Sequence, residues 1–351
     1  GFSGRAMPKA KEKEAAPKAA AAKPKKAVAV TPYQFGNVKE RARLQNTGSR
    51  VINYAVFFTF AALVAAALSV EHWREEAKVQ MDRIESQRVL WGWVSLLDFA
   101  GSALVCWNYR RATERAIKDG DARTRFMHST PLSHYAISIF TCLFMQFGGT
   151  TSTAALLGQN PSWAAGNHVV HAFLLAWWLT FCSPLDLWYK LMGTPILWSP
   201  LQILACISGA HAVTSWGLEK ALNAEHPNMR KSAYAALACG YMSGCFGWAV
   251  VAYFETCGER LKTSGPSWGM QRSFYSVIAY YLATDPHGYL EPIKTLLKVD
   301  TASKSMGKTG VCAFILVCQF GVDIAGVDPL KLLNKATGAL VPLIAPVNMD
   351  L

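Results

Sequence analysis

The sequence is poor in charged residues, which make up 17% of its 351 positions. Ordinary soluble proteins carry about 25%. It also lacks common signatures of catalysis, with no phosphate-binding P-loop and no nucleophile elbow. Its nine cysteines form no Cys-x-x-Cys pair and mostly lie inside apolar runs, which indicates small buried side chains rather than disulfides or a zinc site. These absences predict a protein that is not an enzyme, holds no metal and binds no nucleic acid.

Long apolar runs dominate the rest of the chain. About 20 apolar residues cross a bilayer as a helix. Eight stretches reach or approach that length: 51–70, 89–109, 134–158, 168–191, 196–216, 232–255, 271–283 and 310–324. The stretch 71–88 is charged with a sparse apolar stripe, which is typical of a surface or interfacial helix. The sequence therefore predicts an integral membrane protein with eight spans.

Basic residues are concentrated in residues 1–50, where twelve Lys and Arg stand against three acids in a low-complexity Ala/Lys/Pro sequence. Such a segment cannot form a core. We expect either a solvated arm or an arm that binds an anionic lipid surface or an acidic partner. With eight spans, the distribution of Lys and Arg places both termini on the cytoplasm-like side. The chain opens Gly-Phe, from which we expect either a removed organelle import presequence or an incomplete sequence.

Two glycine clusters stand inside apolar runs, although glycine costs about 1 kcal/mol relative to alanine in a helix. Small residues let membrane helices approach closely, and a glycine pair also permits a kink. We expect both helices to break at these glycines with hydroxyls turned inward, as in an inverted-repeat channel or transporter; simple packing is the alternative. The pore or kink candidates are Gly148, Gly149, Thr150, Ser152, Gly240, Ser243 and Gly244.

From about residue 97 to 319 the sequence resembles the trimeric intracellular cation (TRIC) channels. The resemblance rests on "LLDFAGSALVCW", "FGGTTSTAALLGQNPSW" and above all "WWLTFCSPLDLWYK". It implies an all-α membrane bundle of two inverted three-helix repeats kinked at glycines, a seventh helix, a homotrimer and one cation pore per protomer. The predicted domains are a basic arm (1–50), an extra transmembrane helix with an interfacial helix (51–88), a TRIC-like seven-helix domain (89–328) and a C-terminal tail (329–351).

The chain departs from the family pattern at its charged positions. The resemblance implies basic residues that bind an inositol-lipid phosphate at the pore. A neutral histidine cannot replace permanent cations against a phosphate. We therefore do not expect strong control by an inositol lipid. We expect the bundle to be occluded at this depth by apolar side chains of residues 201–213 and 246–251. The degenerate lipid or pore motif consists of His211, Ala212, Val213 and Ser215, and Ser243 replaces a further basic residue.

Other polar residues receive structural interpretations. Asp186 matches an acidic residue of the family, and we interpret it as a structural acid, either an end cap or an ion-pair partner; a role in permeation is the alternative. His168 and His171 begin a predicted span, where capping is the simpler interpretation. No cofactor is predicted beyond bound lipids, although these histidines would suit a pigment in a photosynthetic membrane.

Two functions remain open from the sequence. The favoured one is an accessory or structural subunit of a larger organellar membrane complex, in a plastid thylakoid or mitochondrial inner membrane. Its partners would be membrane lipids and neighbouring subunits that contact the arm and the first span. The alternative is a homotrimeric K⁺ channel of the TRIC family, for which the resemblance implies the endoplasmic reticulum.

Overall fold

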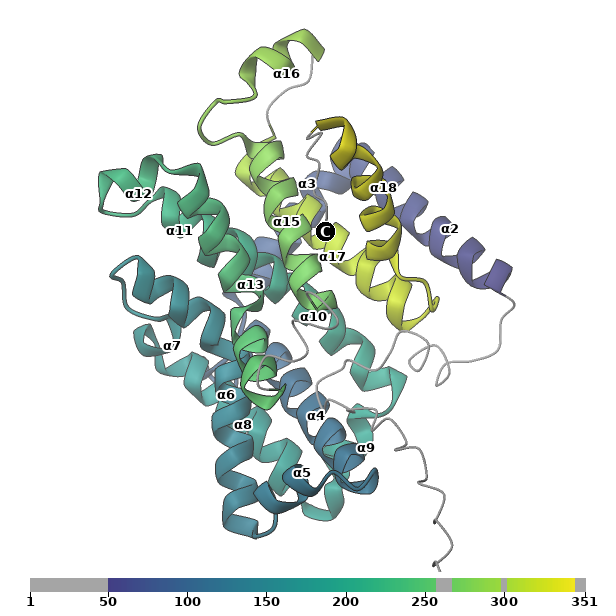
Figure 1. The fold of residues 1–351 in the computed structure, drawn as a ribbon, viewed down its shortest axis with the longest axis vertical. Helices are drawn as coiled ribbons and strands as arrows, with labels where there is room; N and C mark the ends of the chain where they lie inside the picture. The colour runs from purple at the N-terminus through teal and green to yellow at the C-terminus, as the bar shows by residue number, and fades with distance from the viewer. Residues whose placement is uncertain (1–49, 257–266, 298–301, 345–351) are drawn as a thin grey trace, which may run out of the picture. The chain divides into compact units, whose positions relative to one another are not determined.

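The computed structural model describes residues 50–256, 267–297 and 302–344, so the predicted basic arm, apart from Arg50, lies outside the described residues. The described chain is almost entirely helical (Figure 1). The predicted all-α membrane fold is confirmed. In chain order the elements are α2 (Arg50–Ser69), α3 (Glu71–Ser86), β1 (Arg88–Val89), β2 (Val94–Ser95), α4 (Leu96–Lys118), α5 (Ala122–Met127), α6 (Pro131–Leu156), α7 (Ser162–Ala165), α8 (Asn167–Cys182), η1 (Pro184–Asp186), α9 (Leu187–Met192), α10 (Pro195–Val213), η2 (Thr214–Leu218), α11 (Glu219–Leu222), α12 (Pro227–Lys231), α13 (Ala233–Thr256), α15 (Trp268–Thr284), α16 (Glu291–Leu297), α17 (Lys304–Asp323) and α18 (Pro329–Ile344).

Six long helices fall into two consecutive groups of three: α4, α6 and α8, followed by α10, α13 and α15. Equivalent helices of the two groups pack on each other, α13 on α6 and α10 on α4. Each third helix is followed by a left-handed turn at non-glycine residues: Leu185 and Asp186 (φ 55° and 56°) after α8, and Asp285 (φ 39°) after α15. This pairing is the pattern that a pseudo-two-fold relation between repeats predicts. α17 packs against α10 and α15 as a seventh helix.

The amino-terminal helices α2 and α3 pack on the same bundle. Phe57 of α2 is 5% exposed, and Phe60 stacks on Phe320 of α17 with ring centroids 3.9 Å apart. α3 buries Met81 in the main core and leaves most of its charged side chains exposed. An amphipathic helix covers a bundle in this way when its apolar stripe is narrow.

Side-chain caps fix where four of the long helices begin. In each, the N-cap hydroxyl accepts a hydrogen bond from the backbone N–H three residues later. Such a cap is worth about 0.5–2 kcal/mol. The capping residues are Ser95 for α4, Thr130 for α6, Ser267 for α15 and Ser303 for α17.

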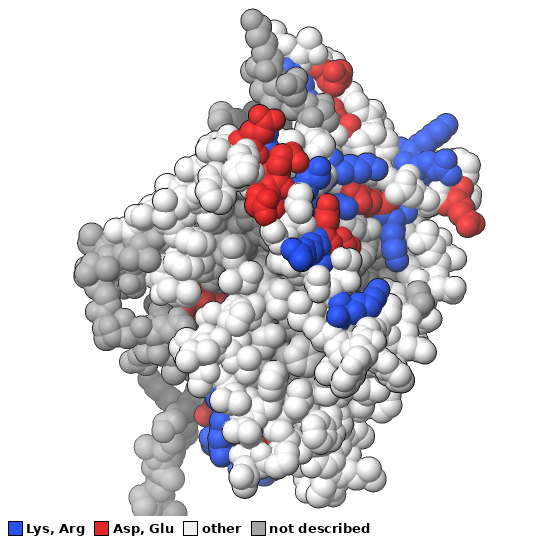
Figure 2. All heavy atoms as spheres, turned by 180° about the vertical axis from the view of Figure 1, so that it is seen from behind, with Lys and Arg blue, Asp and Glu red and all other residues white. Residues whose placement is uncertain are grey.

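Helices occur at all eight positions where spans were predicted, but not every one of them is long and apolar enough to span a membrane by itself. In the described chain, three helices are long and apolar enough to cross a membrane: Pro195–Leu222, Ala233–Val251 and Lys304–Asp323. A bent pair, α8 with α9, would make a fourth. Figure 2 shows charged side chains gathered in its upper part and near its lower end, with a broad uncharged surface between them. The count of eight spans and the placement of both termini on one side stay predictions.

The predicted helix breaks at the glycine clusters are wrong. α6 runs without interruption through Gly148 and Gly149, and α13 runs through Gly240 and Gly244. The break lies instead inside the predicted span 168–191, where α8 and the following helical segment are bent by 90°. Pro184 explains this position, because proline lacks a backbone N–H and disfavours helical geometry in the residue before it.

Two boundaries also differ from the prediction. The expected span 89–109 begins late, because β1 and β2 form a hairpin whose turn places Leu90, Trp91 and Gly92 at positive φ. Trp91 is 94% exposed there, a position that suits an aromatic side chain at a membrane–water interface. The predicted tail 329–351 contains α18, which packs against α15 and α17.

Candidate functional site

The glycine clusters bring α6 and α13 into backbone contact. A Cβ atom on Gly149 would lie 2.5 Å from the carbonyl oxygens of Met242 and Ser243, and one on Gly247 would lie 2.4 Å from the carbonyl oxygen of Phe144. Both distances are shorter than a real Cβ contact, so a larger residue would push the helices apart. Glycine here supplies close approach rather than a kink.

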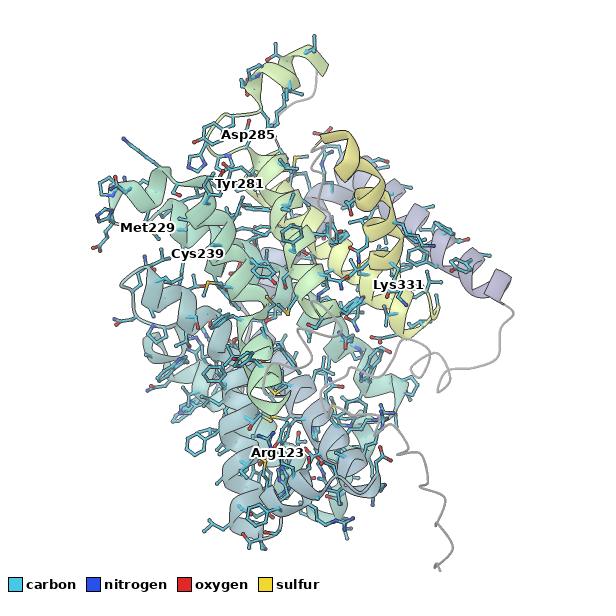
Figure 3. The ribbon with its side chains drawn as sticks, viewed as in Figure 1. Arg123, Met229, Cys239, Tyr281, Asp285 and Lys331 are labelled. Atoms are coloured by element: carbon cyan, nitrogen blue, oxygen red, sulfur yellow. The ribbon has the colours of Figure 1, made fainter. Side chains whose placement is uncertain are left out.

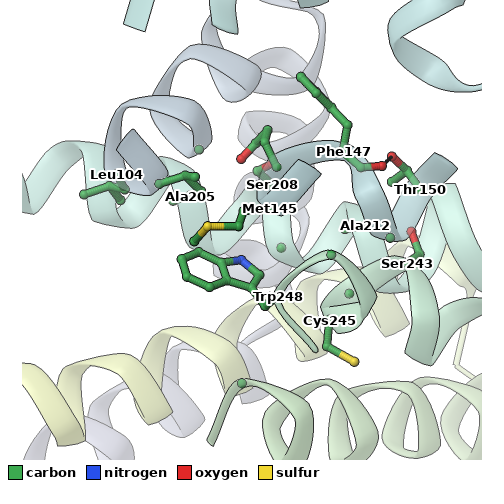
Figure 4. A pocket seen from close by; sticks show the side chains of 18 of the residues that line it. Leu104, Met145, Phe147, Thr150, Ala205, Ser208, Ala212, Ser243, Cys245 and Trp248 are labelled. Carbon is green, nitrogen blue, oxygen red and sulfur yellow. Dashed lines mark hydrogen bonds between the residues drawn. The ribbon is translucent and has the colours of Figure 1, made fainter. Parts of the chain in front are cut away.

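A cavity of about 230 Å³ lies beside this contact, among α4, α6, α10, α13, α15 and α17. Its lining follows α10 from Gln202 to Ala212 and α4 from Asp98 to Asn108, which corresponds to about 15 Å along each helix at 1.5 Å per residue. Figure 4 shows side chains of α4, α6, α10 and α13 around the cavity. Polar groups alternate in this lining with apolar ones such as Leu104. A cavity is not a path across the bundle, so the predicted occlusion by apolar side chains stays a prediction.

Five of the predicted site residues line the cavity: Gly149, Thr150, Ala212, Ser243 and Gly244. They come from three different helices. The Ser243 hydroxyl is buried and has no hydrogen-bond partner among the described residues. The Thr150 hydroxyl donates to the carbonyl of its own helix at Phe147, 3.1 Å away.

The other predicted residues are absent from the cavity lining. Gly148 faces Gly247, and the Ser152 hydroxyl donates to the Gly148 carbonyl at 2.8 Å. Gly240 packs against the backbone of Val213 and the side chain of Val277. These positions serve helix packing and stay outside the polar space.

His211 lies at the end of α10, where the chain enters the π-helical turn η2. Its ring is 1% exposed, and its Nδ1 atom lies 3.4 Å from Ser215 Oγ and 3.5 Å from Glu85 Oε1. The Nε2 atom is buried with no hydrogen-bond partner in the described part of the chain. His211 therefore connects α10 to α3, whereas Ala212 faces the cavity and Val213 packs on α13. The four motif residues do not form one site.

The prediction missed the cation in the cavity lining, Arg272 of α15. Its Nη1 atom donates to Gln319 Oε1 at 3.1 Å, and the guanidinium lies 5.1 Å from the ring centre of Trp268. The Gln319 amide in turn donates to Asp323. A single arginine at the edge of the apolar run 271–283 was the available signal, since an ionisable residue within a span marks a functional site by default.

Asp186 belongs to a second polar cluster, at the bend after α8. Arg110 Nη1 donates to the Thr180 carbonyl at 2.6 Å and pairs with Asp186 Oδ1 at 2.9 Å. Arg110 Nε pairs with Glu114 Oε1 at 2.9 Å, and the guanidinium stacks on the ring of Tyr189, 4.2 Å from its centre. The structure thus contains an ion pair of Asp186, and the pair ties the bend to α4.

Titratable side chains also gather at the two ends of the bundle, where Figure 3 labels Arg123 and Asp285. Near Arg123, His128 Nδ1 lies 3.0 Å from His134 Nδ1, and His128 Nε2 lies 3.3 Å from the Tyr109 hydroxyl. Burial, with a smaller contribution from the neighbouring His134, lowers the pKa of His128 to about 4. This ring therefore stays neutral at physiological pH.

Comparisons with known proteins find a likeness to solved structures only. No family model and no curated protein matches the sequence. Among solved structures, it is similar to a trimeric intracellular cation channel from C. elegans determined without Ca²⁺, with 16% identity, a TM-score of 0.46, and coverage of 76% of this chain and 98% of that one. The same kind of channel with bound Ca²⁺ gives 18% identity, a TM-score of 0.48, and coverage of 70% and 95%. The pairing of α4 with α10 and of α6 with α13 independently supports a bundle of two related three-helix groups.

Proposed function

We propose that this chain is an accessory or structural subunit of a larger organellar membrane complex, in a plastid or mitochondrial membrane, and that its bundle does not conduct cations. The observation that carries the proposal is the guanidinium of Arg272 in the lining of the polar cavity. Arginine keeps its charge under all physiological conditions. A K⁺ ion that entered this space would meet a fixed positive charge.

The repulsion between this charge and a nearby cation is large. Two unit charges 4 Å apart repel each other by about 4 kcal/mol at an effective dielectric constant of about 20. Fixed cations in narrow pores exclude cations in this way. Asp98 also lines the cavity, but it lies within electrostatic reach of Arg88 and His168, so its charge is already partly balanced.

The extra helices support the role of a subunit. α2 uses Phe57 and Phe60 against α17 and presents Phe58 and Leu63 outward, 56% and 64% exposed. Lipid or a neighbouring subunit would cover this outer face. The basic arm that precedes α2 in the sequence would add contacts with anionic lipid or an acidic partner.

Reconstitution tests the proposal directly. Purified protein in liposomes loaded with K⁺ should show a K⁺ flux no greater than protein-free liposomes, with an added ionophore as the positive control. Lysine-directed crosslinking in native membranes should join residues 1–50 to the same neighbouring subunits in repeated preparations. K⁺ currents that change with substitution of a cavity residue such as Thr150 would overturn the proposal.

The alternative function is a homotrimeric monovalent cation channel. The polar lining of the cavity favours it, because Asn108, Thr150, Gln202 and Ser208 offer oxygen atoms to a partly dehydrated cation. The two functions differ in the effect of neutralising Arg272. A channel would pass K⁺ with Arg272 in place and more K⁺ after Arg272→Gln, whereas a scaffold would pass none with Arg272 in place.

A further inference from the structure

Two residues in the cavity lining carry a formal charge, Asp98 and Arg272. Neither forms an ion pair with another residue in the described part of the chain. Their surroundings differ. Asp98 has the Ser95 hydroxyl beside it and two basic side chains, Arg88 and His168, within electrostatic reach.

Arg272 has neutral neighbours instead. Its contacts among the described residues are the amide oxygen of Gln319 and the ring of Trp268. Two carboxylates stand one hydrogen bond further away, Asp323 beyond Gln319 and Asp328 beyond the Trp268 indole N–H, and neither lines the cavity. A guanidinium has five N–H donors, and one of them is used by Gln319. Arg272 is therefore a cavity charge that lacks a direct negative partner among the described residues.

A second donor lies in the wall of the same space. α13 and α15 touch where a Cβ atom on Gly244 would lie 2.8 Å from Ser273 Oγ. The residues just before these two, Ser243 and Arg272, both line the cavity. Ser243 as a whole is 7% exposed, and its hydroxyl oxygen is buried with no hydrogen-bond partner in the described chain. A buried hydroxyl without a partner costs about 1–3 kcal/mol, so a ligand that accepts its hydrogen bond would be stabilised.

We propose that this cavity binds a small inorganic monoanion of the chloride class, with the Arg272 guanidinium and the Ser243 hydroxyl as hydrogen-bond donors. Charge-assisted hydrogen bonds of this kind are roughly twice as strong as neutral ones. The cavity of about 230 Å³ is far larger than the 10–15 Å³ that one water needs, so the anion keeps part of its hydration shell. The inference is independent of the proposed function, because either a scaffold or a channel contains this cavity.

The test uses the full-length protein in nanodiscs of zwitterionic lipid, titrated with chloride against gluconate at constant ionic strength. The ³⁵Cl NMR line width and the melting temperature are measured. The wild-type protein should show saturable broadening and stabilisation by chloride. Arg272→Gln should weaken apparent chloride affinity by roughly tenfold or more, and Ser243→Ala should weaken it by a smaller factor. Arg83→Gln, which removes an exposed cation from α3, is the matched control and should change nothing.

Ser243→Ala also protects the test against misfolding, because it removes one oxygen atom from a buried side chain and adds no bulk. Equal chloride affinity in wild type, Arg272→Gln and Ser243→Ala would overturn the proposal. So would a wild-type protein without saturable broadening. A second arm places the protein in nanodiscs with anionic lipid and gluconate alone. Stabilisation there that depends on Arg272, without any effect of chloride, would identify a lipid phosphate as the ligand and also overturn the proposal.

Discussion

Gly148 of α6 and Gly247 of α13 meet at the crossing of their helices, where a Cβ atom on Gly148 would lie 2.9 Å from the Cα of Gly247. The next residue of α6, Gly149, rests on the backbone of Met242 and Ser243, about one turn before Gly247 on α13. Lipid gives membrane helices no hydrophobic reason to associate, so close van der Waals contact must hold them together. This crossing also determines how far apart the walls of the neighbouring cavity stand.

Replacement of Gly247 by alanine should destabilise the bundle by about 1–3 kcal/mol, the usual cost of overpacking. The obstacle is the Phe144 carbonyl oxygen, 2.4 Å from the new Cβ, and a helix backbone cannot move aside as a side chain can. The melting temperature in detergent measures the effect. Gly310→Ala is the matched control: Gly310 lies in α17 with nothing within 4 Å, and alanine should stabilise that helix by up to about 1 kcal/mol. Equal melting temperatures for the two variants would contradict the packing role of Gly247.

The sequence predicted much of the fold, because apolar runs and their separators largely determine helix existence in a membrane protein. It did not predict the geometry within the helices. The Gly148–Gly149 pair is compatible with either a kink or a close contact, and only the partner helix decides between them. In contrast, Pro184 carried a local signal for a break, although the predicted span 168–191 ran through it.

Arg110 should be essential for the bend after α8. Its guanidinium joins the Thr180 carbonyl, Asp186 and Glu114 and stacks on Tyr189. Arg110→Gln should destabilise the protein by roughly 1.5–3 kcal/mol, the range for hydrogen bonds to charged groups. Arg110→Lys should recover only part of this loss, because lysine keeps the charge but not the planar fork. Thermal unfolding compares these variants, with exposed Arg125→Gln as the control; full rescue by lysine would mean that charge alone matters.

His128 should make stability depend on pH. Its pKa is about 4 in the folded protein, below the value of about 6.5 in an unfolded chain. As pH falls below 6.5, the unfolded chain therefore binds a proton before the folded protein does. The stabilisation is complete above pH 6.5 and decreases as pH falls to about 4. NMR titration of the ring should give the low pKa directly.

A matched variant isolates the contribution of His128. His128→Gln cannot titrate, so its stability should fall less steeply than that of the wild type between pH 6.5 and 4. Identical slopes for both proteins would mean that other groups cause the acid sensitivity. The comparison is needed because a second titratable ring is close by: His134 Nδ1 lies 3.0 Å from His128 Nδ1.

The cavity was harder to predict than the fold. Thr150 was identified because hydroxyls beside glycines suggest an inward-facing polar surface, and Ser243 because the resemblance implies a basic residue at its position. Arg272 was missed because it stands at the edge of an apolar run, where a basic side chain is normally interpreted as reaching the membrane surface. His211 was placed in the pore by the resemblance alone, whereas the structure places it against Glu85 of α3. No motif in the sequence indicates that α3 would lie there.

The last prediction concerns the attachment of α2. Phe57 is 5% exposed and packs against Gly321 of α17, with a ring carbon 3.0 Å from the position of a Cβ atom on that glycine. Its neighbour Phe58 is 56% exposed on the same helix. Phe57→Ala should destabilise the packing of α2 by up to about 3–5 kcal/mol, as phenylalanine deletion does in a close-packed core. Phe58→Ala should have little effect on the isolated protein. Hydrogen exchange along α2 measures both variants in nanodiscs.

If α2 also contacts a neighbouring subunit, Phe58→Ala should weaken assembly in native membranes while leaving exchange in the purified protein unchanged. Equal protection of α2 in wild type and Phe57→Ala would show that α17 does not hold this helix in place.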